Sequence, residues 1–324
     1  MIAENIFFRL ICEAAKAPSG HNTQPWKFII KGDTINICPD YNRALPVVDS
    51  DNHALFISLG CALENLIVAA EHQGLKAFPS ITVDTENPCI RVVLTEAESL
   101  TQESLSEYIP LRQVSRGAYS SRRVEDEELD KLREEIAIPG TEVRYFITPE
   151  EIEALAPFII EGSDLQFSNK RFVEELVKWI RFNKRDAERS RDGIWGATMN
   201  MPSIPRWVGS FIMKRLITAE SESKRWKKLI SASAGFALFM VEKDDVEHWI
   251  ALGRSFQRFG LLTTKMGIKH AHVNMPCEEV IVRKKLAAKF CEGNKTPLLL
   301  VRFGYAGETP YSYRREIPEV VANE

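Results

Sequence analysis

The sequence lacks a strong excess of charge of either sign. Its 324 residues carry a formal net charge of −3, and charged residues make up 27% of the chain. A nucleic acid partner, or an anionic membrane surface, is therefore not predicted, because both require a basic surface. The partner expected from this composition is a small molecule.

Cysteine is scarce, and long apolar runs are missing. The N-terminal segment is interrupted by Arg9, Glu13 and Lys16, and no stretch approaches the length needed to cross a bilayer. There is no Cys-x-x-Cys pair, and the six cysteines have mostly apolar neighbours. This pattern predicts reduced core thiols in a cytoplasmic protein. The six are Cys12, Cys38, Cys61, Cys89, Cys277 and Cys291.

Catalytic and metal-binding constellations are also missing. No Ser/His/Asp arrangement and no pair of carboxylates stands out. His270 and His272 are two residues apart, but no third residue with metal-like spacing lies nearby. We interpret these histidines as ordinary strand residues and predict no metal site.

Polar residues gather in one segment near the N-terminus. A helix-compatible run over residues 2–17 meets Pro18, which ends it, and an apolar, β-branched run begins at Trp26. Between them, Gly20 would let a flat ligand approach the main chain, while the amides of Asn22 and Gln24 offer donors and acceptors. The segment could equally be a capped turn whose amides satisfy backbone groups. Its central residues are Ser19, Gly20, His21, Asn22, Thr23 and Gln24.

The rest of the chain alternates helical and extended patterns. A helix with leucines at three- and four-residue steps is predicted from about residue 51 to 73, where Gly74 ends it. Strands are predicted at 26–30, 34–38, 77–83 and 90–94, which close a first module near residue 96, and later at 142–147 and 297–303. Further helices are predicted at 125–136, 149–160 and 168–184.

One helical pattern occurs twice. Gly60 is followed by Gly74 and Gly253 by Gly267, with the same fourteen-residue spacing, and each copy leads into a strand. We interpret this as an internal duplication, which predicts two related modules about an approximate twofold axis. The predicted modules are residues 1–100 and 101–324, the second with a helical insertion at about 150–230.

The 185–207 segment mixes glycine, proline, methionine and tryptophan. We interpret it either as a lid that covers a ligand or as an ordinary connecting segment that is held in place by its own buried apolar side chains. The basic run at 224–228 is interpreted as a solvated helix face, although a positive rim would also attract a phosphorylated cofactor. Arg112 and Arg116, four residues apart near a predicted helix end, could both point at one anion.

Several of these segments resemble the flavin-dependent nitroreductases. The sequence A-P-S-G-H-N-T-Q-P-W resembles their Pro-Ser-x-x-Asn-x-Gln-Pro-Trp segment, which lies against the FMN ring. The 112–116 segment is similar to their Arg-x-Ser-x-Arg/Lys phosphate motif, although Val114 stands where a hydroxyl residue is common. The resemblance extends to their last strand and terminal phosphate-binding arginine, matched by Arg314 or Arg315, and to a flavin-facing segment that contains Asn274. It therefore implies FMN contacts from Pro18, Ser19, Gly20, Asn22, Gln24, Arg112, Arg116, Asn274, Arg314 and Arg315.

The first module holds the loop and the second holds the arginines, so each carries half of a site. This organisation resembles the Acg-like branch, in which one chain corresponds to a fused dimer with one composite site. The resemblance implies an α+β fold, with mixed sheets flanked by helices and a helical lid, in a monomeric pseudo-dimer or a homodimer.

The implied activity is an oxidoreductase that passes hydride from NAD(P)H through FMN to a nitroaromatic, quinone or similar acceptor. No catalytic side chain is implied, because the flavin N5 carries the chemistry. One alternative is an FMN-sequestering protein whose lid blocks the nicotinamide. Another keeps the fold without the flavin.

Overall fold

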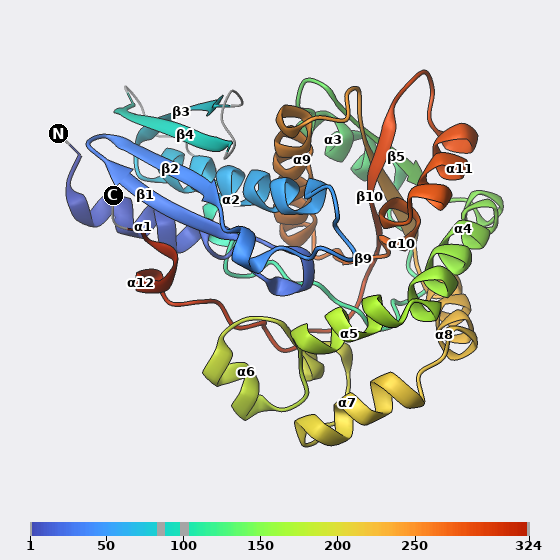
Figure 1. Ribbon diagram of the computed structural model, residues 1–324. Helices are drawn as coiled ribbons and strands as arrows, with labels where there is room; N and C mark the ends of the chain where they lie inside the picture. Colours follow the sequence, from blue (N-terminus) through green and yellow to red (C-terminus); the bar gives the residue numbers. More distant parts are fainter. Residues whose placement is uncertain (1, 83–87, 98–103, 323–324) are drawn as a thin grey trace.

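The fold contains two four-stranded sheets, which Figure 1 shows on either side of a central pair of helices. The computed structural model describes residues 2–82, 88–97 and 104–322. The first sheet has the order β1 (Trp26–Lys31), β2 (Thr34–Pro39), β4 (Cys89–Glu96), β3 (Leu75–Thr82). The second has the order β5 (Thr141–Phe146), β8 (Gly235–Val241), β10 (Thr296–Gly304), β9 (Lys269–His272). The predicted module boundary at residue 100 lies outside the described residues.

Neighbouring strands in both four-stranded sheets are antiparallel, which corrects the prediction of mixed sheets. The hairpin of β1 and β2 returns on itself within a short turn, which favours antiparallel pairing. In the described residues, parallel pairing is confined to a small pair, β6 (Ile180–Arg181) with β7 (Ile194–Trp195), and to two single bridges. These bridges join Phe28 to Val321 at the edge strand β1, and Val114 to His270 at the edge strand β9.

The two copies of the repeated pattern form the central helices α2 (His53–His72) and α9 (Val246–Lys265). They cross at the repeated glycines, because a Cβ on Gly253 would lie 2.0 Å from the Ile57 carbonyl oxygen, and one on Gly60 would lie 2.2 Å from that of Ile250. Within the described residues, α2 is the one helix long and apolar enough to cross a membrane, so the prediction that no stretch approaches this length is wrong for α2; 94% of its apolar window is buried in the protein. The repeat therefore marks the closest approach between the two halves of the core.

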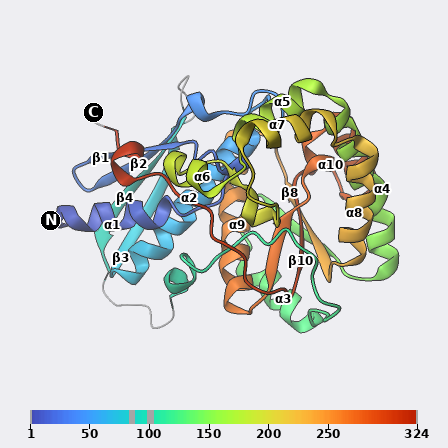
Figure 2. The same cartoon turned by 90° about the horizontal axis from the view of Figure 1, so that it is seen from below.

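The remaining helices cover the sheets. Helix α1 packs on α2, while α4 packs on α8 and α11 beside the second sheet. Figure 1 shows α5, α6 and α7 as a layer beneath the sheets, and Figure 2 shows the C-terminal segment crossing that underside from β10 to α12. The predicted basic run lies on α8, where Lys224, Arg225, Lys227 and Lys228 are exposed. The bounds are α1 (Glu4–Ala14), α3 (Asp126–Glu135), α4 (Pro149–Ser168), α5 (Lys170–Trp179), α6 (Lys184–Ser190), α7 (Arg206–Arg215), α8 (Ala219–Ser231), α10 (Met275–Glu278), α11 (Val280–Phe290) and α12 (Ile317–Val320).

Two cysteines form a disulfide, so the prediction of six reduced thiols is wrong for this pair. Cys38 is the last but one residue of β2 and Cys89 is the first of β4, and they are the chain neighbours of the paired residues Ile37 and Ile90. Their Cα atoms are 4.5 Å apart, although 51 residues separate them in the sequence. Strand register brings them together, and no local spacing predicts it. Within the described residues, Cys12, Cys61, Cys277 and Cys291 are free thiols.

Candidate functional site

A cavity of about 280 Å³ lies where the two halves of the chain meet. Residues 18–22 of the N-terminal loop form one wall, and α2 forms another through Ile57, Ser58 and Cys61. The second half contributes the 112–116 segment, residues of β9 and α10, and the C-terminal residues 310–314. The cavity is therefore composite, as the distribution of motifs between the halves predicts.

The N-terminal loop has an unusual backbone. His21, Asn22 and Gln24 all have positive φ, at 48°, 54° and 54°, a conformation that costs energy for non-glycine residues. The Ser19 hydroxyl oxygen accepts a hydrogen bond of 2.9 Å from the Gln24 N–H. Such a conformation persists only where the surrounding contacts hold it, which is common at binding sites.

Four of the five loop residues predicted to bind a cofactor line the cavity. These are Pro18, Ser19, Gly20 and Asn22. Gln24 does not line it, because its side chain is fully buried behind the loop. There, Gln24 Nε2 donates to the Arg191 carbonyl oxygen (2.9 Å), and its Oε1 accepts from the Arg315 N–H (2.8 Å).

Arg112 and Arg116 both reach the cavity from the segment that follows a short 3-10 helix, Leu105–Tyr108, and the Arg112 N–H donates to the Tyr108 carbonyl oxygen (2.9 Å). Val114 bridges to His270 in the parallel sense, and the Ser115 N–H donates to the His270 carbonyl oxygen (2.9 Å). Alternate residues of an extended chain point to the same side. Arg112, Val114 and Arg116 line the cavity, but so does Gln113, so alternation alone does not account for the lining.

The structure separates the two C-terminal arginines. Arg314 lines the cavity, donating to Asn22 Oδ1 (3.0 Å) and to the Lys16 carbonyl oxygen (3.2 Å). Arg315 points away, and its guanidinium donates to the carbonyl oxygens of Gln24 and Glu319. Arg314 is therefore the arginine positioned to contact a ligand.

The three cavity arginines are wholly or partly buried: Arg112 is buried, and Arg116 and Arg314 are half-buried. Within the described residues, no carboxylate forms an ion pair with Arg112, Arg116 or Arg314. Burial lowers the pKa of Arg112 and of Arg116 to about 10, and burial followed by the charge of Arg112 lowers that of Arg314 to about 9. Arg112 Nε and Nη1, and Arg314 Nε, are buried without a hydrogen-bond partner in this part of the chain. A ligand with several anionic oxygens would satisfy these donors.

The histidines of the cavity add no positive charge at neutral pH. Burial, and then the charge of Arg116, lowers the pKa of His21 to about 4. Burial, and then the charges of Arg116 and Arg112, lower the pKa of His272 to about 3. His270 and His272 share a strand face, as predicted, and both contact the Phe256 ring, but His272 also lines the cavity.

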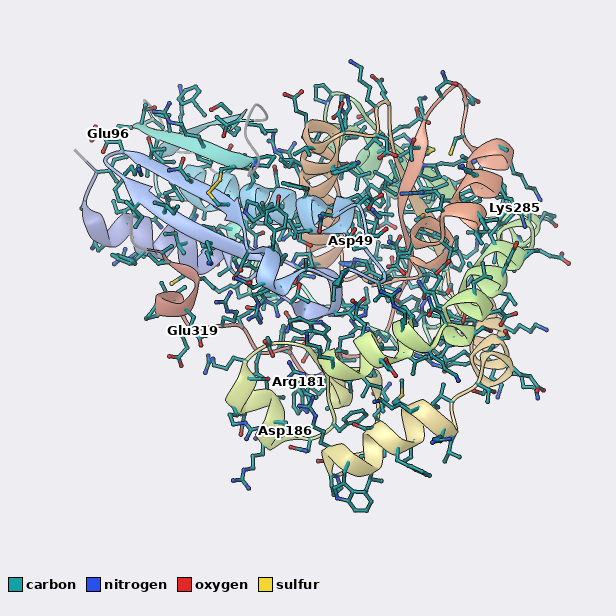
Figure 3. All side chains as sticks on the ribbon, viewed as in Figure 1. Asp49, Glu96, Arg181, Asp186, Lys285 and Glu319 are labelled. Carbon is teal, nitrogen blue, oxygen red and sulfur yellow. A yellow bond between two sulfur atoms is a disulfide. The ribbon has the colours of Figure 1, made fainter. Side chains whose placement is uncertain are left out.

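The 185–207 segment lies against this site. Gly193 N–H donates to the Asn22 carbonyl oxygen (3.1 Å), and Ile194 lines the cavity. Asp192 accepts hydrogen bonds from Arg43 of the first half and from Arg181. These hydrogen bonds lower the pKa of Asp192 although burial opposes the shift. Figure 3 shows Arg181 and Asp186 in the layer of α5 and α6 beneath the sheets.

An acidic cluster at the start of α2 lies beside the cavity. Ligand atoms of Asp49, Asp51 and His53 lie within 4.8 Å of one another. Both oxygens of Asp49 accept backbone N–H groups of α2 at 2.9 Å, and Asp51 forms an ion pair with Arg283. These contacts explain the cluster as a helix cap with a counter-ion.

The sequence of this chain is similar to those of known proteins, in one case over most of its length. It is 23% identical over 320 residues to "Putative NAD(P)H nitroreductase Rv3131" of Mycobacterium tuberculosis, covering 95% of this chain and 88% of that protein. It is 29% identical over 77 residues to "Putative NAD(P)H nitroreductase acg" of the same organism, covering 24% of this chain and 23% of that protein. The chain is thus similar over most of its length to a protein named as a nitroreductase. No family model matches it.

Solved structures of nitroreductases align with part of the chain. A nitroreductase-like protein of Bacillus cereus aligns with a TM-score of 0.42 at 13% identity, over 68% of this chain and 96% of its own. NfnB of Mycobacterium smegmatis, solved with NADPH, aligns with a TM-score of 0.41 at 14% identity, over 62% of this chain and 87% of its own.

The nitroreductase resemblance accounts for only one of three residues in a polar corner of the cavity. Asn274, Gln166 and Glu278 line it together. Gln166 Nε2 donates to Glu278 (2.6 Å), while Asn274 Oδ1 accepts from the Leu300 N–H (2.9 Å). Burial raises the pKa of Glu278, although hydrogen bonds from Gln166 and Asn274 oppose the shift. Only Asn274 was predicted, because no sequence pattern distinguishes Gln166 or Glu278 from other helical polar residues.

Proposed function

We propose that this chain is an FMN-dependent oxidoreductase that takes hydride from NAD(P)H and passes electrons to a nitroaromatic, quinone or similar acceptor. The observation that carries the proposal is a group of three wholly or partly buried arginines, which have no carboxylate partner among the described residues and face a loop with the nitroreductase flavin motif. The names of the sequence relatives agree with this activity.

The cavity fits the FMN phosphate. Arg112 and Arg314 present buried N–H groups that have no protein partner among the described residues, and Arg116 lies on the same side as Arg112. Guanidinium groups bind phosphate oxygens through paired, charge-assisted hydrogen bonds. Val114 supplies no hydroxyl, so in this chain the phosphate would rely on the arginines.

The remaining walls suit a flat ring. Pro18, Ser19 and Gly20 present the loop on one side, and Ile57 and Cys61 of α2 also line the cavity. Bound FMN would supply the redox chemistry. The chain would bind and orient it and exclude water, and the positive charge of the cavity would favour the anionic reduced form.

The alternative function is FMN sequestration, and the 185–207 segment favours it. Ile194 closes part of the cavity, and Thr198 Oγ1 accepts a hydrogen bond of 3.3 Å from Arg116. A segment that stays in this position as a lid would prevent a nicotinamide from stacking on the flavin.

Anaerobic reduction separates the two functions. The protein is saturated with FMN, freed of excess cofactor, and mixed with NADPH and then NADH while the visible flavin band is followed. Bleaching supports the oxidoreductase. A flavin that stays oxidised with both donors, but bleaches with dithionite, supports sequestration. Failure to retain FMN refutes both functions.

We also propose that the two halves are duplicated modules with one surviving site. If Gly60 and Gly253 are equivalent, Cys61, which lines the cavity, corresponds to Arg254. Arg254 is instead paired with the fully buried Glu64 (2.9 Å), so this position is taken up by an ion pair. We expect one FMN per chain from the ratio of flavin to protein absorbance, and two per chain would contradict the proposal.

A further inference from the structure

We infer that Asn22 and Gln24 are positioning residues that tie the 185–207 segment to the cofactor site, although the motif resemblance assigns them to the cofactor itself. The inference rests on the proposed function for the identity of the ligand. The contacts that carry it are all within the protein.

Asn22 has no amide hydrogen left for a ligand. Its Nδ2 donates to the carbonyl oxygens of Gly193 (3.0 Å) and Tyr313 (3.1 Å), which uses both hydrogens. Its Oδ1 accepts from Arg314 Nη1 (3.0 Å), and its own carbonyl oxygen accepts from the Gly193 N–H (3.1 Å). One side chain thus joins the loop, the 185–207 segment and the C-terminal segment.

Gln24 completes the same network from behind the loop. Its Nε2 donates to the carbonyl oxygens of Arg191 (2.9 Å) and Asn22 (3.4 Å), and its Oε1 accepts from the Arg315 N–H (2.8 Å). Arg191 Nε in turn donates to the Arg314 carbonyl oxygen (2.9 Å). Both motif amides are therefore committed to holding three chain segments together.

Arg314 links this network to the ligand. It lines the cavity and, through Nη1, holds Asn22, which holds Gly193. An anion that fixes the Arg314 guanidinium therefore stabilises the closed position of the 185–207 segment. By thermodynamic reciprocity, the closed segment stabilises the bound anion. In this chain, Asn22 couples cofactor retention to closure.

Limited trypsin digestion of the full chain tests the coupling, with cleavage within 185–207 followed by mass spectrometry. Asn22→Ala removes the side-chain bonds, and Asn22→Asp removes the two donors but keeps an acceptor for Arg314. Asn169→Ala is the matched control, because Asn169 accepts the Arg171 N–H at the start of α5 and, within the described residues, forms no hydrogen bond with the loop. Circular dichroism confirms that each variant is folded.

We expect both Asn22 variants to be cleaved about tenfold faster than the native chain without ligand, since about two neutral hydrogen bonds are lost. We expect FMN to protect the 185–207 segment of the native chain and of Asn169→Ala, with this protection lost in Asn22→Ala. FMN release from Asn22→Ala, followed by flavin fluorescence after dilution, should be about tenfold faster.

Native-like cleavage in both Asn22 variants would overturn the inference. Faster FMN release with unchanged cleavage would also overturn it, and would assign Asn22 to direct contact with the cofactor. If no variant, including the native chain, binds FMN, the proposed function fails. The digestion without ligand then still decides whether Asn22 holds the segment.

Discussion

Replacing Arg112 by methionine should move stability and cofactor binding in opposite directions. The Arg112 side chain is 6% exposed, and two of its nitrogens have no partner in the described part of the chain. Its remaining contact is a 3.5 Å hydrogen bond to the Lys16 carbonyl oxygen. Methionine keeps an unbranched apolar side chain at this position without the buried charge.

The expected change in stability follows from the free-energy cost of burying the Arg112 charge. Burial lowers the pKa of Arg112 from 12.5 to about 10. At about 1.4 kcal/mol per pKa unit, this corresponds to roughly 3 kcal/mol against the charged form. After allowance for the lost packing and hydrogen bond, we expect Arg112→Met to stabilise the FMN-free protein by about 1–2 kcal/mol. FMN affinity should fall by roughly 1.5–3 kcal/mol, because one charge-assisted phosphate contact is lost.

Chemical denaturation of the FMN-free protein and fluorescence titration with FMN measure the two effects. Arg206→Met is the control, because Arg206 is exposed on α7, and neither quantity should change. If Arg112→Met instead lowers the free energy of unfolding by more than about 1 kcal/mol, Arg112 makes favourable contacts in the FMN-free protein. That result would refute the claim that its buried charge is unsatisfied. An unchanged FMN affinity would refute the phosphate assignment.

Three further predictions concern the core, the disulfide and pH. Gly253→Ala places a Cβ 2.0 Å from a carbonyl oxygen of α2, so its unfolding free energy should fall by about 2 kcal/mol or more. Gly307→Ala, which meets no atom within 4 Å, should leave the denaturant midpoint unchanged. Replacing Cys38 and Cys89 by serine should lower the stability of the oxidised protein by about 2–4 kcal/mol in urea, and an equal loss in the presence of reductant would contradict this. Burial and neighbouring arginines lower the pKa of His272 to about 3, whereas the unfolded side chain takes up a proton near pH 6.5. Stability should therefore fall as pH decreases from 6.5 towards 3, and His272→Gln should reduce this slope in thermal melts; an unchanged slope would show that His272 does not contribute.

Much of the site could be predicted because its residues lie in short motifs. The loop from Pro18 to Asn22 and the pair Arg112 and Arg116, which follows a short helix, line one cavity. Residues four apart lie on the same side of a helix, and alternate residues lie on the same side of an extended segment. Arg112 and Arg116 therefore share a side in either conformation. Glu278 could not be predicted, because its proximity to the cavity depends on how α10 packs.

The sequence by itself determined the local features of this protein. Leucine periodicity places α2, Gly74 ends it with a φ of 71°, and the repeated glycines mark the helix crossing. Such features depend on neighbours within a few residues, so local chemistry is sufficient to predict them.

Only the tertiary structure decided which side chains share a surface. It selected Arg314 over Arg315, turned Gln24 away from the cavity, and joined Cys38 to Cys89. Gln24 and Arg315 are 291 positions apart, and their hydrogen bond exists because the C-terminal segment returns beneath the first sheet. Whether an amide faces a ligand or another chain segment depends on such long-range packing, which a local motif does not encode.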